Sequence, residues 1–476
     1  MDAIVSFFGF LQSLGVSVMM PIVITIIGCA LGAGFGKSLK AGLLVGVGFI
    51  GLNLVINQLF GSSLGPAVQE MIKRFGLQLS VMDVGWPAGA AIALGTAVGL
   101  VIIPLGLVVN ILLVLINFTQ TVNVDIWNYW HFAFVGSLVA NVTGNLTLGF
   151  AAAIIDEIIL LVLADATAKD VQKALNMPGV SISQGFSLAY APVAWAINWV
   201  LDRIPGVRDI DIDIEKMQKK FGVFGEPLFI GTIIGIIIGF VAYFDGSDVA
   251  GSITQVLTLG VSLGAVLVLI PRMASLLMEG LMPISDAASN FIQTRVKNRG
   301  NIYIGLDSAI AVGYPATLSL ALILIPLMVA FALILQPLGN QTLPFVDLTA
   351  GTYLLAVAVP ICKGNGFRGL IVGLVSVVGL LLISTALAPL ITQSAMQAGF
   401  DIAGAVGDTG VAGSSLVTVL SDGGSPLSGV FVLLSSINPI VGVVVTGVVA
   451  VAMGLWNRQR IMKEAAELHA GTSEQA

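Results

Sequence analysis

Long apolar runs alternate with short polar connections along the whole chain. A spanning helix needs about 20 mostly apolar residues. Uncharged runs of about that length or somewhat shorter or longer lie near 4–32, 41–60, 88–117, 132–155, 227–244, 250–271, 309–336, 348–362, 369–391 and 429–456. Weaker runs at 153–164, 184–201 and 402–420 contain charges or many Gly and Ser residues, which is typical of re-entrant hairpins or short buried helices. The pattern predicts an all-α polytopic membrane protein with about eleven transmembrane helices plus re-entrant hairpins.

The composition excludes most soluble classes of protein. Of 476 residues, 57% are hydrophobic and only 10% are charged, and the mean hydropathy is +1.01. A soluble globular protein carries about 25% charged residues. The chain therefore lacks the ionic surface of a soluble enzyme, a nucleic-acid-binding protein or a disordered scaffold. The lipid bilayer is its expected surroundings, and we expect no nucleic-acid partner.

Lys and Arg in short connections predict the orientation in the membrane. They gather in the segment 202–226, which alternates charged and apolar residues and is predicted to be an amphipathic cytoplasmic loop, and in the tail 458–476. The N-terminus has no basic segment and no small-residue cleavage site, so we interpret its apolar run as the first span. We expect a single membrane domain over 1–457, followed by a cytoplasmic tail over 458–476.

Polar side chains within the apolar runs are candidates for solute binding, because ionisable groups are costly at membrane depth. They collect beside Gly and Pro, where broken helices of transporters bind hydrophilic solutes. Carboxylates, amides and a histidine suit the hydroxyls of a polyol or sugar. The candidates are Asp307 as the main hydroxyl acceptor, with Asp83, His131, Gln184, Asn365 and Ser425 lining the site.

The same residues have a simpler interpretation, since Asp307 or Asp422 could cap the helix that follows it. Catalysis is not indicated, because no nucleophile elbow or zinc-binding motif is present in the sequence. With only two cysteines and two histidines, we expect no catalytic residue, no metal and no cofactor.

Several motifs give the chain a family resemblance. Asp83-Val-Gly-Trp-Pro87, the block 122–128 with His131, the segment 220–227, Ile304-Gly-Leu-Asp307 and Gly423-Gly-Ser-Pro426 follow in order over nearly the whole chain. In this it resembles the galactitol-type permease IIC component of the bacterial phosphoenolpyruvate-dependent sugar phosphotransferase system, which is related to the ascorbate IIC permeases.

The resemblance implies a multi-pass protein of the bacterial inner membrane with a cytoplasmic C-terminus. It implies inward transport of a polyol or sugar, coupled to phosphorylation by a separate IIB subunit that a IIA subunit charges. It also implies interleaved core and scaffold domains, an elevator-type movement and a homodimer. In the galactitol permeases a histidine-glycine pair takes the place of Gln184-Gly185, so the substrate here is expected to be galactitol-like rather than fixed as galactitol.

Two other functions remain open. An ion-coupled secondary transporter would use Asp83 or Asp307 to bind H⁺ or Na⁺, since buried carboxylates suit that role as well. A scaffold or sensor without transport activity would need no solute site at all. Whether the chain counts as an enzyme is a matter of convention, because a phosphotransferase complex transfers the phosphoryl group but no phosphoryl-carrying residue is evident in this chain.

Overall fold

The chain is predominantly helical in the computed structural model, which describes residues 16–55, 62–75, 80–125, 128–210, 212, 227–295, 302–344, 347, 350–400, 402 and 416–473. The helices of the first half are α2 (Val16–Ala30), α3 (Phe35–Asn53), α4 (Ser62–Phe75), α5 (Gly85–Gly95), α6 (Gly99–Leu115), α7 (Tyr129–Thr143), α8 (Leu146–Leu175), α9 (Gly185–Ala189) and α10 (Ala191–Leu201). Those of the second half are α12 (Pro227–Tyr243), α13 (Val249–Arg295), α14 (Ala309–Val312), α15 (Pro315–Ile334), the 3₁₀ helix η4 (Gln336–Leu338), α16 (Ala350–Ile361), α17 (Gly366–Gln397), α19 (Leu420–Gly423), α20 (Pro426–Ile437) and α21 (Pro439–Ser473).

Several of these helices are compatible with membrane spans. Among the described residues, five helices are long and apolar enough to cross a membrane, and a sixth span is possible if a bent pair counts as one. That pair covers Ala88–Gly95 and Gly99–Leu115 and is bent by 89°. Shorter apolar helices add to the membrane-compatible surface. The helices are thus compatible with the expected membrane protein, while the number of about eleven spans stays a prediction.

Two predicted spans are wrong as single helices. The run 132–155 is divided between α7 and α8 because Gly144 adopts a left-handed φ of 63° and ends α7. The side chain of Asn145 then accepts hydrogen bonds from the peptide N–H groups of Thr147 and Leu148 and starts α8. The run 429–456 is likewise divided, between α20 and α21, at Asn438. Hydropathy alone does not register such a turn, since Gly and Asn interrupt an apolar run only briefly.

The expectation of an all-α protein is also incomplete, because six short strands occur in the described residues. They are β1 (Val81–Asp83), β2 (Thr121–Asn123), β3 (Val180–Ile182), β4 (Tyr303–Leu306), β5 (Thr342–Leu343) and β6 (Leu416–Thr418). They form two parallel three-stranded sheets with the orders β5-β1-β6 and β2-β4-β3. Strands of two to four residues are too short to show an alternating sequence pattern.

The register of the strands decides where the polar residues lie. Asp83 pairs with Thr418 in the first sheet, and Ile182 pairs with Leu306 in the second. Because parallel strands end at the same edge of a sheet, the residues that follow them gather there. The carboxyl edge of the first sheet leads into α5 and α19, and that of the second leads into α9 and α14.

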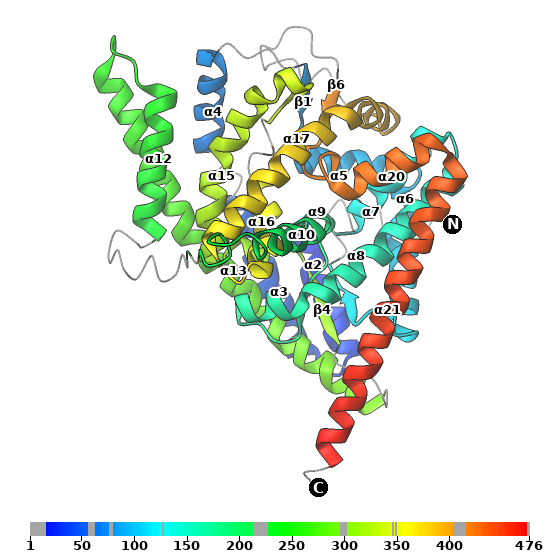
Figure 1. Ribbon diagram of the computed structural model, residues 1–476. Helices are drawn as coiled ribbons and strands as arrows, with labels where there is room; N and C mark the ends of the chain where they lie inside the picture. The colour runs from blue at the N-terminus through cyan, green and yellow to red at the C-terminus, as the bar shows by residue number, and fades with distance from the viewer. Residues whose placement is uncertain are drawn as a thin grey trace.

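Four helices, α2, α3, α12 and α13, pack mainly on one another. Helices α2 and α3 pack on each other and on α13, which also pairs closely with α12. A Cβ added to Gly235 would lie 2.7 Å from the Cα of Gly260, so the backbones of α12 and α13 nearly touch there. Figure 1 shows α12 and α21 on opposite flanks of the molecule, with α16 and the short helices α9 and α10 between them.

Candidate functional site

The carboxyl edges of the two sheets meet at a buried hydrogen bond between a histidine and an aspartate. His131 lies in the first turn of α7, which follows β2, and its Nδ1 is 2.7 Å from Oδ1 of Asp422 in α19, which follows β6. The two side chains are only 2% and 4% exposed. Asp422 therefore holds the imidazole at Nδ1, and Nε2 lies on the opposite edge of the ring. A carboxylate in this position sets both the ring orientation and the tautomer of a neutral histidine.

Gln184 and Asp307 come from the second sheet, one or two residues beyond β3 and β4. The peptide N–H of Ser183 donates to the carbonyl of Leu306 at 2.9 Å, which holds the two strand ends together. Asp307 lies close enough to His131 for their charges to interact. The site thus gathers side chains that are far apart in the sequence.

Gly185 lets the start of α9 approach His131 closely, because it has no side chain. A Cβ at Gly185 would be 2.8 Å from the Cβ of His131 and 3.1 Å from Leu160. On its own helix the imidazole stacks against Trp130, with ring centroids 4.1 Å apart. The histidine is consequently confined by neighbours as well as by its hydrogen bond.

Three side chains keep an atom that is not used in a hydrogen bond with the described part of the chain. Oδ1 of Asp307 accepts from the peptide N–H of Ala309 at 2.7 Å, which leaves Oδ2 as an acceptor. Oε1 of Gln184 accepts from the N–H of Ser187 at 2.8 Å, which leaves the amide nitrogen as a donor. His131 keeps Nε2. Capping and solute binding are thus compatible, because each cap uses one oxygen only.

Asp83 has a different environment. Its Oδ1 accepts from the N–H groups of Gly85 and Leu420, both at 3.1 Å, and its Oδ2 accepts from the N–H of Asp347 at 2.6 Å. Asp347 in turn accepts from the N–H of Trp86 at 2.7 Å. The two buried carboxyls tie the starts of α5 and α19 to the segment after β5. Asp83 supports the backbone that carries Asp422.

Ser425 and Asn365 lie in unlike places. The N–H of Ser425 donates to the carbonyl of Asp422 at 3.2 Å, so Ser425 is beside the histidine pair and is 4% exposed. Asn365 follows the far end of α16, where its Oδ1 accepts from the N–H of Arg368 and its Nδ2 donates to the carbonyl of Ile210. Asn365 therefore contacts the start of the segment 202–226, and the structure does not bring it to His131.

Comparison with known proteins decides the family. The family described as "PTS system sugar-specific permease component" matches residues 9–405. A "Putative permease IIC component" of Escherichia coli K12 is 37% identical over 457 residues, which is 96% of this chain and 100% of that protein. The "PTS system galactitol-specific EIIC component" of the same organism is 37% identical over 453 residues, 95% of this chain and 96% of the relative, and so is its counterpart from Escherichia coli O157:H7.

The chain belongs to this family of phosphotransferase permeases. The resemblance drawn from the motifs is thereby confirmed. Membership implies a sugar-type substrate and partner IIA and IIB components. Together with the apolar helices, it supports an integral protein of the inner membrane.

Sequence reasoning missed several residues of the permease's interior. Asp422 was not among the six candidates because a helix cap explained it equally well, although it is the hydrogen-bond partner of His131. Asp347 and Tyr353, which follow β5, interact electrostatically with one another, and Tyr353 also interacts with Asp307. Asp156 and Glu157 were treated as interruptions of a span, but both are buried in α8. Their position inside an apolar run was the signal that could have identified them.

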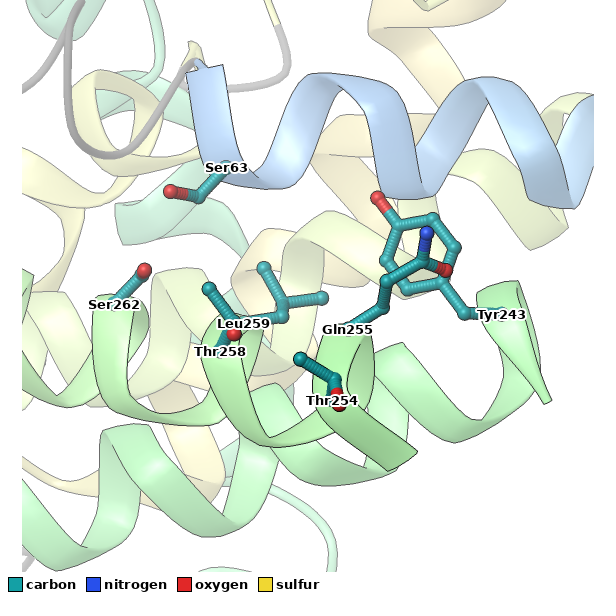
Figure 2. A pocket seen from close by; sticks show the side chains of 7 residues that line it. All are labelled: Ser63, Tyr243, Thr254, Gln255, Thr258, Leu259 and Ser262. Atoms are coloured by element: carbon teal, nitrogen blue, oxygen red, sulfur yellow. The ribbon is translucent and has the colours of Figure 1, made fainter. Parts of the chain in front are cut away.

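A separate polar pocket of about 260 Å³ lies among α4, α12 and α13. Figure 2 shows the hydroxyls of Ser63 on α4 and of Ser262 and Thr254 on α13, with the ring of Tyr243 at the end of α12. The guanidinium of Arg74 fixes α4 there by donating to the carbonyl of Phe244 at 2.8 Å. None of the six predicted site residues lines this pocket.

Proposed function

We propose that the permease carries a galactitol-like polyol or related carbohydrate inward, and that a separate IIB subunit phosphorylates it. Family membership and the galactitol-specific relatives support this substrate class. The single observation that carries the proposal is the set of unused polar atoms on His131, Gln184 and Asp307 around the buried hydrogen bond between His131 and Asp422. An acceptor, an amide donor and an imidazole nitrogen together match the donor and acceptor pattern of neighbouring hydroxyls.

The six candidates then have distinct roles. Asp307 accepts a hydroxyl hydrogen bond through Oδ2, while His131, Gln184 and Ser425 complete the contacts from the other sides. Asp83 stabilises the backbone next to Asp422 by accepting hydrogen bonds from the N–H groups of Leu420 and Asp347. Asn365 has a structural role away from the solute, on the side we propose to be cytoplasmic, where it joins α17 to the segment 202–226. Because Gln184 replaces the imidazole of the galactitol permeases, the hydroxyl pattern that is preferred differs from that of galactitol.

We further propose the membrane arrangement that the resemblance implies. It has about eleven spans, a domain over 1–457 with core and scaffold parts, a cytoplasmic tail over 458–476 and a homodimeric assembly. Transport is of the elevator type. The separate packing of α2, α3, α12 and α13 supports a distinction between a scaffold and a core that holds the solute.

Uptake into membrane vesicles tests the function. Vesicles supplied with IIA, IIB and phosphoenolpyruvate should accumulate phosphorylated polyol, and an ionophore should leave this uptake unchanged. Accumulation of unmodified solute that collapses with the ionophore would instead establish the ion-coupled secondary transporter, which the buried carboxylates of the site also permit.

Asp307→Asn is the matched test of the site. It should reduce uptake strongly, because the charged acceptor of a hydroxyl is replaced by a neutral group. The control is Asp209→Asn, since the Asp209 side chain is 71% exposed in the loop after α10. Equal uptake by the two variants would reduce Asp307 to a helix cap.

A further inference from the structure

Helix α8 contains three buried carboxyl groups with contrasting surroundings. Asp156, Glu157 and Asp165 are 1%, 0% and 2% exposed. Asp165 accepts from the N–H of Gln120 at 2.7 Å, from the hydroxyl of Thr121 at 2.7 Å and from the amide of Asn457. Its two oxygens are therefore satisfied as in an ionised carboxylate.

Asp156 and Glu157 lack such partners. Oδ1 of Asp156 and both oxygens of Glu157 have no hydrogen-bond partner among the described residues. The ion pairs found in that same part of the chain do not include either group. An ionised carboxylate in such a place is destabilised by several kcal/mol, whereas a protonated one is not.

A second observation links these groups to the solute site. Asp156 interacts electrostatically with Asp422, and Glu157 interacts electrostatically with Asp156. Asp422 uses Oδ1 for His131, while its buried Oδ2 has no partner within the described residues. Asp422, Asp156 and Glu157 thus each keep a buried oxygen that is unpaired in the described part of the chain and interact electrostatically in series, and His131 joins this group through its bond to Asp422.

The elements packed around α8 supply few other titratable groups here. Helix α7 contributes Tyr129 and His131, and the junction of α9 and α10 contributes Tyr190. Both tyrosine hydroxyls already donate to backbone carbonyls, of Asn123 and Gly424. Helix α6 has no ionisable residue, α16 has only Tyr353, and the charges of α21 lie near its far end, where Lys169 bonds Glu464. No cation neutralises the carboxyls in this environment as described.

We propose that Asp156 and Glu157 form a proton-binding site whose occupancy is linked to solute binding through Asp422 and His131. A proton from water adds to a carboxylate oxygen, and no other bond changes. A metal ion would need a larger set of ligands, and within the described residues no group of three or more His, Cys, Asp or Glu side chains is placed to hold one.

The direction of the linkage follows from burial. An uncharged polyol bound beside His131 displaces water from the neighbourhood of the buried Asp422 and Asp156 side chains, and the less polar surroundings favour the protonated form of a carboxyl. Solute binding is therefore accompanied by proton uptake. By linkage, solute affinity falls as the pH rises through the range in which the site loses its proton, by at most about tenfold per pH unit for one proton.

Infrared spectroscopy tests the proton site without any solute. Purified wild-type protein at neutral pH should show the carbonyl stretching band of buried protonated carboxyls, and the band should disappear at alkaline pH. Asp156→Asn and Glu157→Gln should each weaken the band, while Asp165→Asn should leave it unchanged. A wild-type spectrum without the band, or variants that are folded and keep it in full, would overturn the proposal.

Proton exchange in weakly buffered solution tests the linkage, which rests on the proposed function. Adding galactitol or a related polyol that binds should cause proton uptake by wild type and by Asp165→Asn, and none by Asp156→Asn that still binds. Binding to wild type without proton exchange would refute the linkage. If none of the polyols binds, the proposed function fails, and the infrared result still decides the proton site.

Discussion

Asp422→Asn tests whether the carboxylate orients His131 for solute binding. The substitution keeps the shape of the side chain and its place at the start of α19. It replaces a charged acceptor, 2.7 Å from the imidazole, by a neutral amide that does not fix the tautomer in the same way. We expect weaker binding of the polyol, because Nε2 of His131 is then held less firmly toward it.

The size of the effect follows from the burial of the pair. At 2% and 4% exposure, solvent screens the two groups little. Hydrogen bonds to charged groups contribute about 1.5–3 kcal/mol, and those between neutral groups about 0.5–1.5 kcal/mol. Since 1.4 kcal/mol is tenfold in affinity, a difference of about 1–2 kcal/mol corresponds to a loss of about 5- to 30-fold.

Equilibrium binding of the polyol to purified protein measures this loss, and a double-mutant cycle identifies its cause. In a His131→Gln background, Asp422→Asn should have little further effect, because the group that it positions is gone. Asp209→Asn in the exposed loop serves as the control for a change of charge. The reasoning is refuted if Asp422→Asn weakens binding equally with and without His131, since Asp422 would then act only on the fold.

Three further substitutions examine neighbouring parts of the site. Gln184→His should change the order in which polyols compete for uptake, since an imidazole replaces the free amide donor; an unchanged order would remove this position from the determinants of specificity. Gly185→Ala should lower uptake about tenfold or more, because its Cβ would lie 2.8 Å from His131 and overpacking costs about 1–3 kcal/mol; uptake equal to wild type would show that the ring moves without consequence. Asn365→Ala should reduce stability by about 1 kcal/mol through loss of the cap on Arg368, measured by thermal unfolding, while polyol affinity stays the same.

The hydropathy pattern identified spans best where lipid exposure demands an unbroken apolar surface. The predicted run 227–244 corresponds to α12, Pro227–Tyr243. The hydropathy pattern predicted helix bounds less well where the backbone turns inside the protein, as at Gly144. There the interior provides hydrogen-bond partners for irregular backbone, so the sequence needs only one or two turn residues.

The sequence indicated only some residues of the candidate site. Polar residues beside Gly occur both at helix caps and at solute sites, so the sequence does not distinguish the two. The sequence indicated Asp307, His131 and Gln184 because each lies at a break in an apolar run, and breaks are where the two sheets end. Asn365 has the same signature, a polar residue before a Gly, yet it caps α17. A cap and a solute ligand require the same residue types, so only the fold separates them.

Asp156 and Glu157 show the opposite error. Their charge interrupted a predicted span, although α8 continues through them over Leu146–Leu175. A helix tolerates such residues when they face other protein segments instead of lipid, and the sequence does not reveal which face that is. The electrostatic interaction of Asp156 with the candidate site depends on Asp422 in α19, which is about 260 residues away in the sequence.

The origin of the proposed ligands limits which transport movements are compatible with them. His131, Gln184, Asp307 and Asp422 come from α7, the β3–α9 and β4–α14 junctions and α19, and none comes from α2, α3, α12 or α13. A mechanism that moved the two sheets and the helices after them apart would separate His131 in α7 from Asp422 in α19. A displacement of the whole ligand set against α12 and α13 would preserve that bond throughout transport. In such a displacement, the contacts of α12 and α13 with α15 would be the ones that change. The buried hydrogen bond between His131 and Asp422 favours this second mechanism, because breaking it in each cycle would leave a buried polar group unsatisfied at a cost of about 1–3 kcal/mol.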